Sequence, residues 1–359
     1  MKRLLTVFLT LALAGALGGC GANYPTIVMP QSSAPSSAAR EDTAEDEDAK
    51  NPEAGADREE SASRPERSSE PESSSEPESA APEPAAVENS PGAEDYRYFV
   101  KDSAATLFEY HGDGGKITVP AYIDGYQVAA LYETFQDNDN VTSVTIPGTI
   151  STISNDAFSG CTSLTSITIS EGVEKIGSAA FQNCTGLAEV SIPGSVTSIG
   201  SYAFDGCTAL TALTIPEGVS HIGNSTFADC TALAELTLPD TLTLLGDTAF
   251  TGCESLTSVT IPGSIQTVEA GLFTGCSSLQ SLTLEEGVSE FSVRAVWGCK
   301  NLVSLTIPKS VTKFDTSGAA GPGAEVNLLT GCPNVELSCY EGSEAALYAE
   351  EYGIPFHLL

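Results

Sequence analysis

Basic side chains are scarce in this sequence. Its 359 residues include 15 Lys and Arg against 48 Asp and Glu, which gives a formal net charge of −33 at neutral pH. The shortage holds along the chain, since residues 21–95 contain 19 acidic and 5 basic side chains and residues 96–359 contain 29 and 8. Such an acidic chain repels phosphate, so the composition argues against nucleic acid as a partner and against polybasic docking to anionic lipid.

Recognisable catalytic and metal-binding motifs are also missing. There is no Gly-x-Ser-x-Gly and no Cys-x-x-Cys, and the three histidines, His111, His221 and His357, are scattered along the chain. The Asp- and Asn-rich segment 136–140 lacks the ligand spacing and the distal glutamate of an EF-hand loop. The sequence therefore predicts neither an enzyme nor a cofactor or metal site.

Long apolar runs are absent apart from one at the start of the chain. Lys2 and Arg3 precede an apolar stretch, residues 4–17, which is too short for a comfortable membrane span and is typical of an export signal. The stretch ends in Leu17-Gly18-Gly19-Cys20, which resembles a bacterial lipobox. The resemblance implies a signal peptide over residues 1–19 and a lipid on the thiol of Cys20. An ordinary cleaved signal is the alternative.

Residues 20–95 are dominated by Ser, Pro, Glu and Ala and contain almost no aromatic side chains. Such a segment cannot bury enough apolar surface to offset its ordering entropy, so we expect a disordered acidic tether. The tether would connect the lipidated Cys20 to a folded domain over residues 96–359.

What the domain does contain is a repeat of 23 residues. Phenylalanine stands three residues before a cysteine in six copies, and leucine stands three residues after it in seven. The cysteines are Cys161, Cys184, Cys207, Cys230, Cys253, Cys276 and Cys299. A fixed period of this length is typical of a solenoid, in which each copy buries its apolar face only against its neighbours.

Each copy divides into a strand and a turn. The pattern Leu-x-x-Ile-x-Ile alternates apolar and polar positions and predicts a strand, which a following proline usually ends. Segments such as "IGSAAF" (residues 176–181) are expected to form a short helical turn. The strand of one copy would then pair in parallel with that of the next, about 4.8 Å away.

The segment "IPGSVTSIGSYAFDGCTALTALTIP" (residues 192–216) closely resembles the BspA-like class of bacterial leucine-rich repeats. The resemblance covers about residues 96–359. It implies a mostly β solenoid of α/β type, a curved right-handed stack with a parallel sheet on its concave side. It also implies a cell-surface protein that works in adhesion and protein binding.

Nine equivalent positions, from Asn138 to Cys332, predict about nine coils. The spacing from Cys299 to Cys332 is 33, so ten extra residues lie between Phe314 and Leu329. Residues 96–120 are expected to form a hairpin that caps one end. Residues 339–359 are expected to form a helix and a strand at the other, with Ser343 and Gly353 as helix caps.

Two interpretations of the repeated cysteines are open. Exported proteins often carry disulfides, and stacked coils would bring the Cα atoms near disulfide distance. Equivalent side chains of stacked coils point the same way, however, and Asn138 fills one slot without a thiol. Cysteine also packs as a small buried hydrophobe, which favours free buried thiols. A bridge between Cys332 and Cys339 remains a separate alternative.

The outward strand positions form one candidate binding surface. They read as a Ser/Thr ladder from Ser143-x-Thr145 to Ser304-x-Thr306, interrupted by Glu189 and Glu235. The ladder is either a polar binding face or only a soluble, β-forming surface. The two glutamates, about 9–10 Å apart by stacking, have a spacing that an inverting glycosidase could use, although outward carboxylates are ordinary on an acidic protein.

Trp297, the only tryptophan, marks a second candidate. Trp297 comes directly after Val296, which holds the position of the buried phenylalanine in the other copies. The residue after that position should face outward. Basic residues are concentrated nearby in sequence, at Arg294, Lys300, Lys309 and Lys313. An aromatic beside an arginine is the composition of a binding hot spot. The ten extra residues are expected beside Trp297, where they either contribute to a partner site or shield the indole.

The sequence thus predicts a membrane-anchored lipoprotein on the extracellular face of the cell. Its expected work is non-enzymatic binding of a protein or a surface glycan in adhesion. A passive spacer of the envelope without a specific ligand is the alternative.

Overall fold

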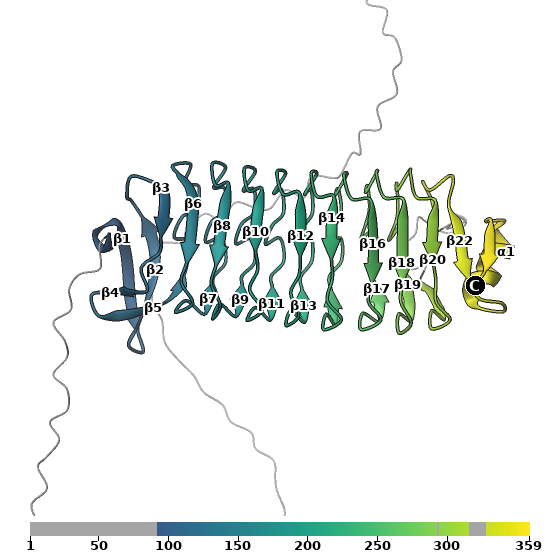
Figure 1. Ribbon diagram of the computed structural model, residues 1–359, viewed down its shortest axis with the longest axis horizontal. Helices are drawn as coiled ribbons and strands as arrows, with labels where there is room; N and C mark the ends of the chain where they lie inside the picture. Colours follow the sequence, from purple (N-terminus) through teal and green to yellow (C-terminus); the bar gives the residue numbers. More distant parts are fainter. Residues whose placement is uncertain (1–91, 293, 316–327) are drawn as a thin grey trace, which may run out of the picture. The chain divides into compact units, whose positions relative to one another are not determined.

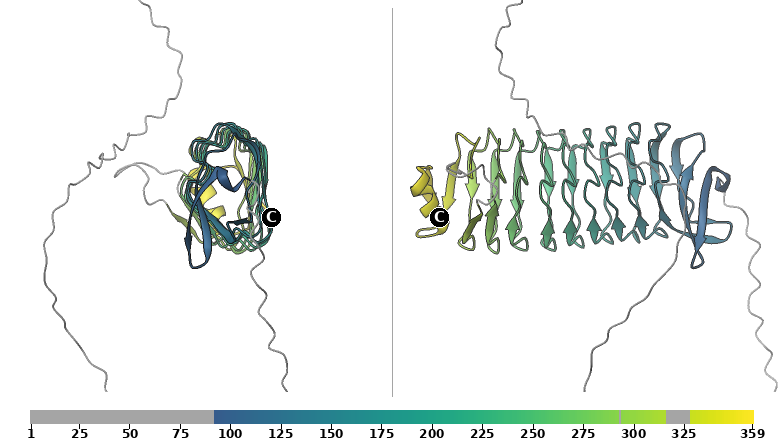
Figure 2. Two further views of the ribbon diagram at one scale, coloured as in Figure 1. Left: turned by 90° about the vertical axis from the view of Figure 1, so that its left-hand side faces the viewer. Right: turned by 180° about the vertical axis from the view of Figure 1, so that it is seen from behind.

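The computed structural model describes residues 92–292, 294–315 and 328–359 of the chain. The predicted signal peptide, Cys20 and most of the predicted tether lie outside these residues, as does most of the inserted segment between Phe314 and Leu329. No helix within the described ranges is long and apolar enough to cross a membrane. The described residues form a stack of coils drawn in Figure 1, and the coils superpose when viewed along the stack in Figure 2.

One side of the stack carries the strands that the sequence predicts, and we call it the Ser/Thr face. All pairings along it are parallel and keep the 23-residue spacing through the regular coils, for example Ser143 with Ser166 and Thr145 with Thr168. Its strands are β3 (Gly115–Thr118), β6 (Val141–Ile146), β8 (Ser166–Ile169), β10 (Glu189–Ser191), β12 (Ala212–Thr214), β14 (Glu235–Thr237), β16 (Ser258–Ile261), β18 (Ser281–Leu284), β20 (Ser304–Thr306), β22 (Glu336–Cys339) and β23 (Phe356–Leu358).

A second, mostly parallel set of strands lies on another side of the coils, which we call the second face. The sequence does not predict these strands, because most of them are only two or three residues long and offer no visible alternation. Its strands are β1 (Tyr96–Lys101), β2 (Ala104–Tyr110), β4 (Tyr122–Ile123), β5 (Tyr126–Leu131), β7 (Thr152–Ile153), β9 (Lys175–Ile176), β11 (Ser198–Ile199), β13 (His221–Ile222), β15 (Leu244–Leu245), β17 (Thr267–Val268), β19 (Glu290–Ser292) and β21 (Lys313–Asp315).

The third side of each coil, here the turn side, consists of hydrogen-bonded turns. The prediction of a helical turn at residues 176–181 is wrong, because Ala179 and Asn183 adopt left-handed backbone angles, with φ of 54° and 58°, which interrupt a helix. The turn side binds the next coil instead. The N–H of Phe181 donates to the carbonyl of Ala203 at 2.7 Å, and equivalent bonds recur from coil to coil.

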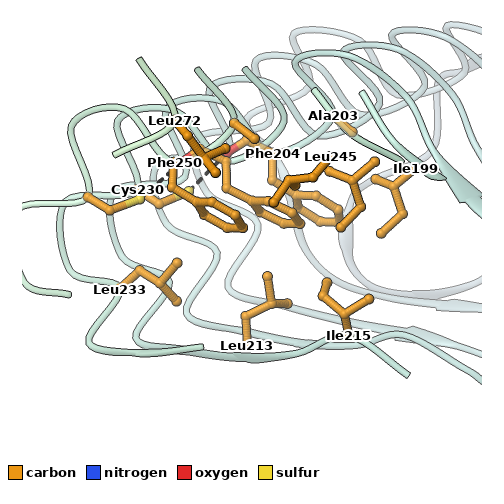
Figure 3. Packing of buried hydrophobic residues seen from close by; sticks show 14 of the residues in the cluster. Ile199, Ala203, Phe204, Leu213, Ile215, Cys230, Leu233, Leu245, Phe250 and Leu272 are labelled. Carbon is orange, nitrogen blue, oxygen red and sulfur yellow. Dashed lines mark hydrogen bonds between the residues drawn. The ribbon is translucent and has the colours of Figure 1, made fainter. Parts of the chain in front are cut away.

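The core is a row of aromatic rings enclosed by the three sides. Phe135, Phe158, Phe181, Phe204, Phe227, Phe250 and Phe273 are all buried. Neighbouring rings are stacked with centroids 4.8–5.7 Å apart and interplanar angles of 5–15°. Figure 3 shows Phe204 and Phe250 in this row, above Leu213 and Leu233. The repeated Phe and Leu positions are therefore packing positions, as the period predicts.

Both predicted caps are present. β1 and β2 pair as an antiparallel hairpin around a turn at Asp102 and Ser103, and β3 adds one coil before the first of the nine predicted ones. At the other end, helix α1 (Glu344–Tyr352) begins at Ser343, whose hydroxyl accepts the N–H of Ala346. It ends at Gly353, which is left-handed at φ 65°, before β23 pairs with β22. A short 3-10 helix (Ala93–Asp95) precedes the hairpin.

Candidate functional site

The Ser/Thr face is a polar ladder, as predicted. Its outward side chains are exposed or half-buried, and the Ser166 hydroxyl donates to the Ser143 hydroxyl at 3.0 Å. Glu189 and Glu235 are both exposed, and β12 lies between their strands in the coil order. No hydrogen bond or ion pair joins either carboxylate to another group in the described part of the chain. The face therefore presents single, solvated carboxylates among hydroxyls.

Trp297 lies on the turn side and is 44% exposed, so the prediction that it faces outward is confirmed. The guanidinium carbon of Arg294 lies 5.7 Å from the centroid of the indole, within the range of a cation–π contact. The next coil packs close to the indole edge, since a Cβ built on Gly331 would lie 3.7 Å from the Trp297 Cδ1 atom. An exposed aromatic and a cation are thus held together on a fixed backbone.

Lys300 borders a cleft of about 510 Å³ between this coil and the C-terminal cap. The cleft is also lined by Leu329, Pro333 and Ile354, and by Gly331, which lies beside the indole. The structure therefore brings Arg294, Trp297 and Lys300 to one edge of the stack, which we call the Trp297 edge. Lys313 does not join it, because its ammonium pairs with the Glu290 carboxylate on the second face at 2.5 Å.

The repeated cysteines are buried and carry free thiols, as favoured from the sequence, and Cys332 and Cys339 are likewise free. The thiols of the seven repeated cysteines from Cys161 to Cys299, which we call the ladder cysteines, each donate to the phenylalanine carbonyl of the preceding coil. One example, Cys230 Sγ to Phe204 O at 3.2 Å, is drawn in Figure 3. Burial raises the pKa of Cys276 to about 12 and that of Cys332 to about 11. These thiols serve packing and hydrogen bonding, because a protonated buried thiol is neither a nucleophile nor a metal ligand.

His221 and the Asp- and Asn-rich segment 136–140 serve local structure. His221 is exposed on β13, where its Nδ1 lies 2.7 Å from the hydroxyl of Ser220. In the segment 136–140, Asn138 Oδ1 accepts the N–H groups of Asn140 and Val141, and Asp139 accepts the hydroxyl of Thr162 at 2.6 Å. Among the described residues no group of three or more His, Cys, Asp or Glu side chains is arranged to hold a metal ion.

One polar cluster was not foreseen. His357 on β23 places its Nε2 2.9 Å from the Ser338 hydroxyl and its Nδ1 3.3 Å from the Glu336 carboxylate. The order of contacts resembles that of a Ser-His-Glu triad. Ser338 is only 5% exposed, however, so its hydroxyl has little access to a substrate. The cluster was missed because β22 and β23 become neighbours only through the returning C-terminal segment.

Comparisons with known proteins agree with this architecture. The family described as "BspA type Leucine rich repeat region" matches residues 131–224 and 199–318, in six copies. No curated protein matches the chain.

Several solved structures are similar. One is a leucine-rich repeat protein of T. pallidum, with 27% identity over 60% of this chain and 91% of that one and a TM-score of 0.47. Another is a leucine-rich cell surface protein of Faecalibacterium prausnitzii, with 25% identity, coverage of 71% and 95%, and a TM-score of 0.35. A third is the pneumococcal vaccine antigen PcpA, with 19% identity, coverage of 71% and 81%, and a TM-score of 0.42.

The two ranges that match the family together span residues 131–318, which is more than half of the chain, and they coincide with the stack of 23-residue coils. The chain therefore belongs to the family of BspA type leucine-rich repeat proteins.

Proposed function

We propose that the protein is a lipid-anchored cell-surface protein whose solenoid binds a protein or a surface glycan without catalysing a reaction. The observation that carries the proposal is the Trp297 edge, where an indole 44% exposed lies under the guanidinium of Arg294. Tryptophan and arginine are the side chains that contribute most to binding energy at protein interfaces. The edge also gathers positive charge on a domain that is otherwise acidic, which favours an acidic or hydroxyl-rich partner.

The Trp297 edge can be tested directly. The full chain, immobilised by its C-terminus, would be presented to matrix proteins and cell-wall glycans, and saturable capture of one ligand is expected. Trp297→Ala and Arg294→Ala should abolish that capture. Tyr202→Ala is the matched control, because Tyr202 occupies the slot of Arg294 four coils earlier and is 46% exposed. Loss of capture in all three variants, or in none, would contradict a site at this edge.

The Ser/Thr face is the second candidate, because its hydroxyls and the exposed Glu189 and Glu235 form a continuous polar surface. If it binds, the double variant Glu189→Gln and Glu235→Gln should change the affinity while Trp297→Ala should not. No capture by any variant or by the wild type would favour the passive spacer.

Membrane attachment through Cys20 is a separate proposal, which rests on the Leu17–Cys20 lipobox. Cys20→Ser should release the protein from the membrane fraction or stall its processing, because the acyl chains would be lost. A Cys20→Ser protein that is cleaved and still fully membrane-bound would overturn it.

A further inference from the structure

Two interruptions of the solenoid fall at the same coil junction. On the Ser/Thr face β14 does not pair with β16, and on the second face β15 does not pair with β17. A break also separates β10 from β12, but there the second face is continuous from β11 to β13. Figure 1 shows β14 and β16 farther apart than their neighbours on either side. Among the described coils, both faces are interrupted at this junction alone.

The turn side remains connected across the junction. The N–H groups of Thr248, Phe250 and Gly252 donate to carbonyls of the next coil at 3.2, 3.0 and 2.8 Å. The ring centroids of Phe250 and Phe273 lie 5.7 Å apart, which is the widest spacing in the phenylalanine row. The narrowest, between Phe135 and Phe158, is 4.8 Å. The two sides that carry strands have separated, while the third side still holds the coils together.

The sequence of the second face changes at the same junction. The position 16 residues after each ladder cysteine is glycine in four successive coils, at Gly177, Gly200, Gly223 and Gly246. A Cβ built at any of these glycines would lie 2.5–2.7 Å from a backbone nitrogen of the preceding coil, which is closer than van der Waals contact allows. The next coil has Glu269 at this position, so it lacks the glycine that permits the close approach in the four coils before it. The coils beyond it carry Ser292 and Asp315 there, inside strands of three residues.

The turns that join the Ser/Thr face to the second face also change their pattern at this junction. The two central residues of each turn follow one of two patterns. In the first, which we call a hydroxyl pair, the second residue is Ser or Thr; in the second, the two residues are Glu and Gly. Along the chain they are Gly148-Thr149, Glu171-Gly172, Gly194-Ser195, Glu217-Gly218, Asp240-Thr241, Gly263-Ser264, Glu286-Gly287 and Lys309-Ser310. The two types alternate except at one place, where Asp240-Thr241 is followed by a second hydroxyl pair, Gly263-Ser264.

The alternation has a physical role. The Glu171 carboxylate accepts the N–H groups of Gly194 and Ser195 at 3.1 Å each, and the Gly172 N–H donates to the Ser195 hydroxyl at 3.0 Å. Glu286 and Gly287 make the same contacts with the turn after them. Two adjoining hydroxyl turns cannot make these contacts, and the buried Ser264 Oγ has no partner in the described structure.

We propose that the solenoid consists of two blocks joined at this junction, and that it flexes there about the turn side. The motion opens and closes the Ser/Thr face at a groove lined by Thr237, Asp240, Ser258 and Thr260. At this junction the turn side keeps its backbone hydrogen bonds, but neither strand side does, so few hydrogen bonds oppose a rotation of one block against the other. Every other described junction keeps the strand pairing on at least one of its two strand sides. The inference is independent of which surface binds a ligand.

Amide hydrogen exchange on the full wild-type chain tests the joint. In neighbouring junctions the N–H groups of Ala234, Thr243, Gln280 and Ser289 donate to the preceding coil at 2.8–3.0 Å. The equivalent N–H groups at the joint belong to Thr257 and Gln266, and no backbone hydrogen bond from either is present in the described structure. We expect these two amides to exchange about tenfold faster than their equivalents. Equal protection would overturn the proposal.

Distance measurements with spin-labelled amino acids provide the second test. Labels at positions 214 and 283 span the joint, and labels at 168 and 237 span the same number of coils within the first block. We expect a clearly broader distance distribution for the pair across the joint. Glu269→Gly should slow the exchange of the Gln266 amide and leave that of Gln280 unchanged. Distance distributions of equal width would show that the stack is rigid at this junction. An unchanged exchange rate of the Gln266 amide would show that the residue at position 269 does not control the joint.

Discussion

Removing one ring from the phenylalanine row tests how the coils are held together. Phe204 is fully buried, and its centroid lies 5.0 Å from that of Phe181 and 5.4 Å from that of Phe227. Phe204→Ala removes one side chain from two coil interfaces at once. Truncation of a buried aromatic costs about 3–5 kcal/mol, and we expect the upper part of that range because both stacked contacts are lost.

Urea unfolding of the variant, followed by circular dichroism, measures this cost, and a broadened transition is expected because a solenoid couples mainly nearest neighbours. Trp297→Ala is the control, since an exposed aromatic of similar size should cost only about 1 kcal/mol. Phe204→Leu should lie between the two. If Phe204→Ala destabilises the protein no more than Trp297→Ala does, the row does not hold the stack together.

Three further outcomes follow from the close packing inside the stack. The ladder thiols should react weakly with a thiol reagent in the native protein and strongly after denaturation without reductant; few free thiols in the denatured protein would mean that the ladder is bridged. Because burial raises the pKa of Cys276 to about 12, its contribution to stability is complete below the ordinary thiol pKa near 9 and is lost as the pH rises toward 12. If the free energy of unfolding stays constant between pH 9 and pH 12 in the wild type as it does in Cys276→Val, the burial of the Cys276 thiol would be contradicted. Gly223→Ala should lower the stability by about 1–3 kcal/mol, because the new Cβ would lie 2.5 Å from the backbone nitrogen of Ser201. Ser292→Ala, at the equivalent position of another coil, should lower it less. Equal losses of stability in thermal unfolding would refute the close approach at Gly223.

The fold could be predicted where the same residue type recurs at the same position of each 23-residue copy. Phenylalanine, leucine and cysteine recur at fixed offsets, and these offsets alone place them in one core and identify the Ser/Thr strands. The second face was not predictable in the same way, because a strand of two residues such as β9 has no alternation to read. The left-handed turns were missed since residues such as Ala179 adopt φ of 54° only because the neighbouring coils hold them there.

The candidate site was predictable only in part. The outward orientation of Trp297 follows from its slot beside Val296, and Arg294 was selected for its nearness in sequence. The role of Gly331 beside the indole and the cleft next to Lys300 depend on how the following coil packs, which no local pattern encodes. The contact of Ser338 with His357 likewise arises from the C-terminal segment returning to pair with β22.

The central claim, that the Trp297 edge binds the ligand, can be measured through the chain's own fluorescence, because Trp297 is its only tryptophan. The indole is 44% exposed, so iodide should quench its emission readily in the free protein. Titration with the captured ligand should shift the emission and protect the indole from iodide, with the same saturation as capture itself. Saturable capture that leaves the emission and the quenching of Trp297 unchanged would place the binding site elsewhere on the solenoid.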